Sequence, residues 1–201
     1  MQAVSFGGLL TGDTVSDYSD AFVFTGPGTT VNVSLNLGFG GSINADNNGF
    51  ASINARTFIH GNLVGQLFHD VFLGVTDVCA VSLFSGLPGG TCSDTYNTIL
   101  TTGSITVPVG SVVFVELLLE TASAAVAGGS SHVSFGNSLD FITGADLFNL
   151  PEGYSVNSES SFVSNNRFRP ERPPSFPEPG STALIGIALL AMMAGARRRK
   201  Q

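Results

Sequence analysis

A strict alternation of apolar and polar residues most constrains how this chain can fold. In the segment Thr30–Phe39 every second residue is apolar, with Asn, Ser or Gly between them. Side chains of a β-strand alternate between the two faces of a sheet, so this spacing buries one face and leaves the other in water. The segment therefore predicts a half-buried strand whose core side chains are Val31, Val33, Leu35, Leu37 and Phe39.

Further strand-like segments follow at short intervals. Period-two or apolar runs occur at Asp20–Thr25, Arg56–His60, Gln66–Val75, Val78–Phe84, Ser104–Val109 and Val112–Leu119. Turn signals separate these runs, for example Gly26-Pro27-Gly28 and Asn48-Gly49. Short strands between such turns are typical of an antiparallel sandwich or barrel. We therefore predict an all-β domain over residues 1–163, an antiparallel β-sandwich of jelly-roll-like type.

Two segments leave their structure open at this point. Val112–Leu119 is almost entirely apolar, which suits a strand buried on both faces or one that crosses the centre of a sandwich. Thr121–Ala127 has the composition of a short helix, but its place between strand-like runs favours a continuing strand. The 16 Phe residues are expected in the core.

The distribution of charge excludes one class of partner. Only 11% of the residues are charged, against about 25% in ordinary globular proteins. From Met1 to Asn166 a single cation, Arg56, stands against thirteen carboxylates. Such a body repels phosphate backbones, so we expect no nucleic-acid binding. It tolerates divalent cations or cationic partners, although an acidic solvated surface is the simpler interpretation.

No catalytic constellation stands out. Glu116 and Glu120 share a face of a predicted strand, but four strand residues separate them by roughly 13 Å. Glycosidases need their two carboxyl groups about 5 Å or about 6.5–9.5 Å apart, so rim charges explain this pair better. Asp140 and Asp146 flank Thr143-Gly144, where turn hydrogen bonds are the usual role of aspartate. We predict a non-catalytic protein.

Metal and sugar sites are equally weak in the sequence. His60, His69 and His132 sit in no metal-spaced motif, although His60 and His69 bracket a predicted hairpin and could meet across it. Asn44–Gly49 resembles the start of a calcium loop, but the twelfth position lacks Glu, so an Asn-Gly hairpin turn is preferred. With no Trp and three Tyr, a sugar platform lacks its usual aromatics. We predict no metal and no cofactor.

The composition changes towards the C-terminus. Residues 164–179 hold five prolines and three arginines without hydrophobic periodicity, which predicts an extended linker outside the packed domain. Residues 180–196 carry no charge and, as a helix, reach about 26 Å, close to what spans a bilayer. A basic tail, residues 197–201, places the C-terminus in the cytoplasm and the β domain outside. The alternative is an apolar helix packed on the domain.

The predicted functional residues of this tail form three groups. The proline-glutamate tripeptide consists of Pro177, Glu178 and Pro179. The membrane helix contains Gly180, Ala183, Leu184, Ile185, Leu189, Leu190 and Ala196. The basic stop-transfer cluster consists of Arg197, Arg198, Arg199 and Lys200.

In order and spacing, these three groups resemble the PEP-CTERM sorting signal. That resemblance covers Pro177 to Gln201 and implies processing by exosortase, a transpeptidase-like membrane protease of Gram-negative bacteria that make extracellular polysaccharide. It implies export, retention by the helix, cleavage near the tripeptide, and release or attachment at the surface. Pro177 to Pro179 would then be recognised by the protease. The stretches Ser104–Ser111 and Ser131–Val163 are similar to the β-sandwich bodies that precede this signal.

One feature departs from that family. Its exported members carry an N-terminal signal peptide, whereas Met1–Asp20 has no cationic region and its apolar positions are broken by Gly and Ser. We expect the true start to lie upstream of Met1, the alternative being a truncated gene.

The two cysteines enclose a short segment with a Leu-Pro-Gly-Gly turn. In an exported protein, Cys79 and Cys92 favour a disulfide, which would contribute about 3 kcal/mol by loop closure. In a cytosolic protein the same pair favours buried thiols.

Three functional classes follow. The leading hypothesis is an exported structural or adhesive protein of the cell surface or extracellular polysaccharide matrix. A polysaccharide-binding module is the second, and it requires two or more Tyr or Phe side chains exposed on one sheet face. A hydrolase of matrix polymers is the third, and it requires two carboxylates in one cleft within about 10 Å.

Overall fold

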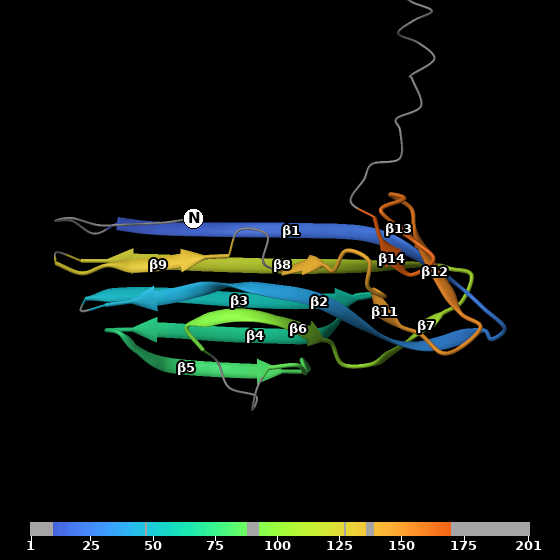
Figure 1. Ribbon diagram of the computed structural model, residues 1–201, viewed down its shortest axis with the longest axis horizontal. Coiled ribbons are helices and arrows are strands. Elements are labelled where there is room, and N and C mark those ends of the chain that lie inside the picture. The colour runs from blue at the N-terminus through green and yellow to red at the C-terminus, as the bar shows by residue number, and fades with distance from the viewer. Residues whose placement is uncertain (1–9, 47, 88–92, 127, 136–138, 170–201) are drawn as a thin grey trace, which may run out of the picture. The chain divides into compact units, whose positions relative to one another are not determined.

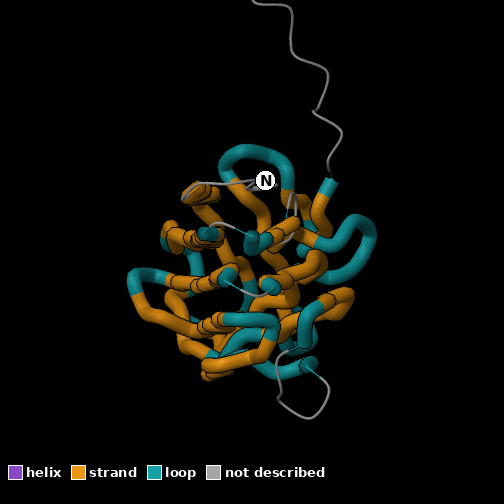
Figure 2. Tube along the Cα trace, turned by 90° about the vertical axis from the view of Figure 1, so that its left-hand side faces the viewer, coloured by secondary structure: helices purple, strands orange, loops and turns teal. Residues whose placement is uncertain are grey.

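The computed structural model describes residues 10–46, 48–87, 93–126, 128–135 and 139–169. These residues form strands joined by turns and loops, and the strands of each sheet are antiparallel (Figure 1). Figure 2 shows strands and loops over the same residues and no helix. Within the described ranges, accordingly, no helix has the length and apolar character needed to cross a membrane. The predicted all-β class is confirmed.

The larger sheet has six strands, ordered β12-β1-β8-β3-β4-β5. Each neighbouring pair is antiparallel, and β1 and β8 are registered over almost their whole lengths. Its strands are β1 (Leu10–Thr25), β3 (Gly49–Ile59), β4 (Asn62–Phe72), β5 (Val75–Ser82), β8 (Val112–Ala125) and β12 (Ser155–Ser158).

The second sheet is built around one long strand, β2. Residues 37–39 of β2 pair with both β6 and β10, so β2 lies between them. Further along its length β2 pairs with β7, β9 and β11. Its strands are β2 (Thr30–Ala45), β6 (Thr95–Thr101), β7 (Ile105–Pro108), β9 (Ser131–Ser134), β10 (Leu139–Phe141) and β11 (Phe148–Asn149).

The core lies between these two sheets. All five apolar residues predicted for the alternating segment are buried in β2, with exposures between 0% and 4%. Around one end of the sheets, Phe22, Phe24 and Phe148 pack with β2; around the other, Phe39, Ile53 and Leu67 do. The period-two prediction is therefore confirmed, because both sheets turn their apolar residues towards each other.

The apolar run Val112–Leu119 is half of β8 and lies at the centre of the larger sheet, as one of the two predictions had it. Burial on both faces is wrong, because burial alternates: Val113 and Val115 are fully buried whereas Phe114 is 60% exposed. The second sheet covers only one face of β8. The strand continues through Thr121 to Ala125, as predicted over the helix alternative.

The β structure extends beyond the predicted domain end at residue 163. A short hairpin of β13 (Val163–Ser164) and β14 (Arg167–Phe168) follows β12. Residues 164–168 therefore belong to the β body and not to the linker. The physical reason is the turn residue Asn166, whose side chain bonds both backbone groups of Phe148, at 2.8 and 2.7 Å.

The prediction of an Asn-Gly hairpin turn at Asn44–Gly49 is wrong, because the strands on its two sides do not pair with each other. The segment joins β2 of one sheet to β3 of the other, so it crosses between sheets. The Asp46 carboxylate accepts hydrogen bonds from the backbone N–H and the hydroxyl of Ser130. The Ser130 hydroxyl and N–H lower the pKa of Asp46. The Asp46–Ser130 contact thus links the loop between β2 and β3 to the segment just before β9.

Candidate functional site

One face of the six-stranded sheet carries no covering layer among the described residues. We call it the open face and define it by the side chains of β1, β8, β3 and β4 that point away from the core. Strand registers place these residues opposite one another. They are Val15, Asp17, Ser19, Ala21, Val23, Phe50, Ser52, Asn54, Arg56, Phe58, Gln66, Phe68, Asp70, Phe72, Val112, Phe114, Glu116, Leu118, Glu120, Ala122 and Ala124.

Aromatic side chains mark both ends of the open face. Phe114 in β8 is 60% exposed and Phe72 in β4 is 44% exposed. Phe50 lies opposite Phe72, with ring centroids 6.5 Å apart. Beside these two rings is a mostly apolar hollow of about 220 Å³, which Leu73 and Val126 also line. The prediction that the Phe residues are core is thus wrong for Phe72 and Phe114, because alternation puts them on the uncovered side.

A polar band crosses the middle of the open face. Arg56 Nη2 and Glu120 Oε1 form an ion pair of 2.8 Å between β3 and β8. The Asn54 side-chain amide donates to Glu120 Oε2 at 2.9 Å. Three atoms of the band have no hydrogen-bond partner in the described chain, namely Asn54 Oδ1, Arg56 Nε and Asp70 Oδ1.

The rest of the open face is acidic. Asp17 in β1 and Glu116 in β8 are both exposed, and neither makes an ion pair with a described residue. With Glu120 and Asp70, the face carries four carboxylates against the guanidinium of Arg56. An electrostatic field of this sign favours cations and repels polyanions.

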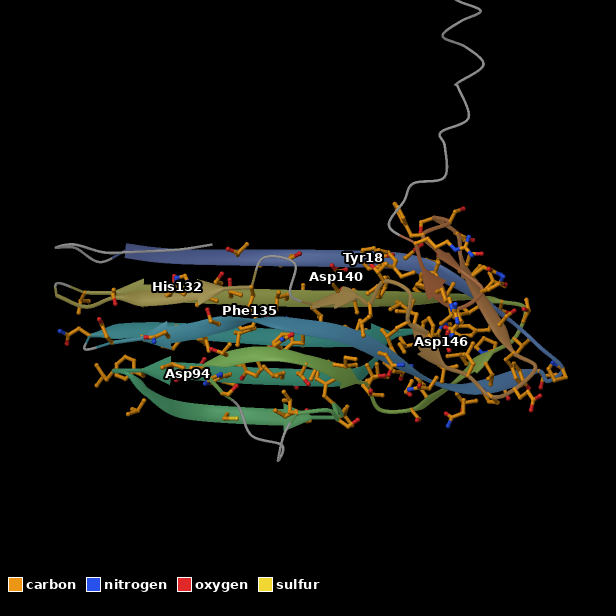
Figure 3. All side chains as sticks on the ribbon, in the orientation of Figure 1. Tyr18, Asp94, His132, Phe135, Asp140 and Asp146 are labelled. Atoms are coloured by element: carbon orange, nitrogen blue, oxygen red, sulfur yellow. The ribbon has the colours of Figure 1, made fainter. Side chains whose placement is uncertain are left out.

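A second polar cluster lies on the core side of β1. Tyr18 donates to Asp20 Oδ2 at 3.0 Å, and the Ser160 hydroxyl donates to the same oxygen. Burial, followed by the charge of Asp20, raises the pKa of Tyr18. Asp140 lies close to Tyr18 (Figure 3) and adds to this effect. Because Asp20 also accepts from the Ala21 N–H at 2.8 Å, its carboxylate is engaged in structure, joining β1 to the segment after β12.

A buried histidine is the third polar feature. His69 is fully buried in β4, and its Nδ1 lies 2.8 Å from the Tyr96 hydroxyl in a hydrogen bond. Its Nε2 has no hydrogen-bond partner among the described residues. Desolvation lowers the pKa of His69, partly offset by the charges of Asp94 and Asp70. Burial likewise raises the pKa of Tyr96 to about 12.

This histidine makes stability depend on pH. The folded pKa of His69 lies below that of the unfolded chain, so the unfolded chain binds the proton first as pH falls. We expect the full contribution above about pH 6.5 and a loss below it. Urea unfolding between pH 5 and 8 measures this effect. His69→Gln should flatten the dependence, whereas the control His132→Gln should keep it; equal slopes in all three proteins would contradict the prediction.

The three histidines do not converge. His60 occupies the turn between β3 and β4, His69 is registered with Ile53, and His132 pairs with Asn44. The suggestion that His60 and His69 meet across their hairpin is therefore wrong. Among the described residues no group of three or more His, Cys, Asp or Glu is placed to hold a metal ion.

The predicted acids have separate roles. Glu116 and Glu120 share the open face, as expected, but on a central strand and not at a rim. Asp140 lies within β10 and not in a turn, and its carboxylate accepts from the N–H of the next residue, Phe141, at 2.8 Å. Asp146 pairs with Arg167 at 3.4 Å.

Other predicted residues fall wholly or partly outside the described ranges. Cys79 lies in β5, registered with His69, but Cys92 is not among the described residues, so the disulfide stays a prediction. The sorting tripeptide, the membrane helix and the basic cluster, all within 177–200, also lie outside them.

The fold and the open face define a class: an antiparallel all-β protein with one uncovered sheet face that is both aromatic and acidic. No protein-family model, no curated protein and no solved structure matches the chain.

Proposed function

We propose that this protein is an exported structural or adhesive protein of the cell surface or extracellular polysaccharide matrix, sorted by an exosortase. The observation that supports this function most strongly is the order of three features in the last 25 residues. A Pro-Glu-Pro tripeptide at 177–179 precedes an uncharged stretch at 180–196 and a basic cluster at 197–200. Such a tail fits a bilayer-spanning anchor with its cationic end in the cytoplasm.

The composition of the body supports the same location. A domain with one cation in its first 166 residues has little attraction for nucleic acid. Its two-sheet body, which we class as a jelly-roll-like sandwich, crosses repeatedly between sheets, and such non-local pairing suits a persistent scaffold. In this proposal the body is non-catalytic and needs no cofactor, and its function is to present a surface outside the cell.

The proposal includes a life cycle. The precursor is held in the inner membrane of a Gram-negative bacterium by the C-terminal helix, and the protease cleaves near Pro179. The body is then released to the cell surface or matrix. Its partners are the exosortase, the membrane before processing, and extracellular polysaccharide.

Expression behind a signal peptide, in hosts with and without an exosortase, tests this proposal. We expect a membrane-bound precursor without the protease and, with it, a mature chain whose C-terminus lies near Pro179 by mass spectrometry. Changing Pro177, Glu178 and Pro179 to Ala should block cleavage. The matched control changes Pro173, Pro174 and Ser175 to Ala and should be cleaved normally. A freely soluble cytosolic chain with an intact tail would refute the proposal.

One observation favours the second functional class, a polysaccharide-binding module. That class requires at least two exposed Tyr or Phe on one sheet face, and Phe72 and Phe114 share the open face. The two classes are compatible, because an adhesive matrix protein must hold the polymer that surrounds it.

A further inference from the structure

We propose that the open face binds an extended polysaccharide whose sugars carry free amino groups. This inference rests on the proposed function, because it names the partner of the exported body. Three observations carry it: exposed rings, a hollow beside one of them, and an excess of carboxylates. The face is long enough for a polymer, since about ten residues of strand between its two aromatic ends span roughly 33 Å.

The aromatic ends supply the apolar contacts. Phe114 and Phe72 expose 60% and 44% of their surface on the same face of the sheet. The faces of aromatic rings are negative, so they attract the C–H side of a sugar ring and still more a protonated amine. The hollow of about 220 Å³ next to Phe50 and Phe72 is open to such a ring.

The exposed carboxylates also supply hydrogen bonds. Asp17 in β1 and Glu116 in β8 are exposed, and a carboxylate accepts from the hydroxyl and ammonium groups of a sugar. The Arg56–Glu120 ion pair lies on the same face, with the two side chains 29% and 38% exposed. Asn54 Oδ1, Asp70 Oδ1 and Arg56 Nε lack partners in the described chain, but these atoms are enclosed and a polymer on the face does not reach them.

The carboxylates select the charge of the polymer. Asp17 and Glu116 lie on neighbouring strands of the open face, in register positions two residues apart. Neither has a cationic partner among the described residues. Ammonium groups would be attracted here, whereas a polyuronate would be repelled. A second copy of the chain would bring two acidic faces together, and protein interfaces are depleted of charge at their centres.

Affinity measurements on the full-length chain in detergent test this inference. The probes are chitosan, which bears amines, N-acetylated chitin oligomers, and alginate as a polyanion. We expect chitosan to bind best and its binding to weaken with salt. The double variant Phe72→Ala with Phe114→Ala should bind about tenfold more weakly. The double variant Asp17→Asn with Glu116→Gln should also bind more weakly and lose most of the salt dependence.

Matched controls change comparable groups elsewhere. Ile99→Ala removes an exposed apolar side chain of β6, and Glu152→Gln removes an exposed carboxylate of a loop; both should bind within about twofold of the parent. Thermal unfolding verifies that each variant is folded.

Three results would overturn the inference: no binding of chitosan, preference for alginate, or equal binding by all variants. Light scattering that shows a dimer lost in the Phe variant would replace the polymer by a second copy. Export and cleavage are scored separately on the same variants. A chain that is exported and processed but binds no chitosan refutes the inference alone, whereas chitosan binding without export refutes only the proposed function.

Discussion

Replacing Phe148 by Ala is expected to lower the free energy of unfolding by about 3–5 kcal/mol. Phe148 is 1% exposed, and its ring meets those of Phe22 and Phe24 edge-on, at centroid distances of 5.4 and 5.1 Å. Truncation removes these aromatic contacts and leaves a cavity between the two sheets. The surrounding strands are paired in sheets, so the space closes only in part. Urea unfolding followed by circular dichroism measures the change.

The matched control is Phe114→Ala, which removes the same ring from the open face. Phe114 is 60% exposed, so we expect a change of no more than about 0.5 kcal/mol. Equal losses from both variants would mean that Phe114 is covered in solution, and the definition of the open face would then be wrong.

Replacing Asn166 by Ala is expected to cost about 2–4 kcal/mol. The Asn166 side chain accepts from the N–H of Phe148 and donates to its C=O, so it takes the place of a neighbouring strand. Loss of these two bonds accounts for about 1 kcal/mol each. The backbone of Asn166 has a φ of 65°, a left-handed conformation that costs Ala about a further 1 kcal/mol. The same urea experiment measures the loss.

Asn166→Gly separates the two causes. Glycine accepts the left-handed conformation but has no side chain to bond Phe148. We expect it to recover about 1 kcal/mol of the alanine loss and no more. If Asn166→Ala is neutral, then residues 164–168 add nothing to the domain, and the linker begins at residue 164 as the sequence predicts.

The strand predictions succeeded where apolar and polar residues alternate regularly within one segment. Residues 30–39 alternate without exception, and burial in β2 follows that pattern. The short strands after residue 130 were not predicted individually. β10 and β11 have three and two residues, too few for a period to emerge, and pairing with distant β2 holds them in place.

The candidate site was harder to predict for a different reason. Alternation in Gly49–Ile59 separates Phe50, Asn54 and Arg56 from Ala51, Ile53 and Ala55, but it does not say which set faces the core. The larger rings of Phe50 and Phe58 favour the wrong set. In the structure, the small residues Ala51 and Ala55 are fully buried, because the second sheet approaches on that side.

The sequence by itself determined the all-β class, the acidic body and the three-part tail. Each depends on residues close together in the chain: the class on alternation, the acidity on composition, and the tail on the order of its three parts. Tertiary structure alone decided which face of the six-stranded sheet stays open. It also brought Arg56 to Glu120 and Asn166 to Phe148. The members of each pair are far apart along the chain. Pairing of β3 with β8 inside one sheet brings Arg56 to Glu120, and the turn between β13 and β14 brings Asn166 to Phe148. The packing of one sheet on the other leaves the outer aromatic residues in solvent.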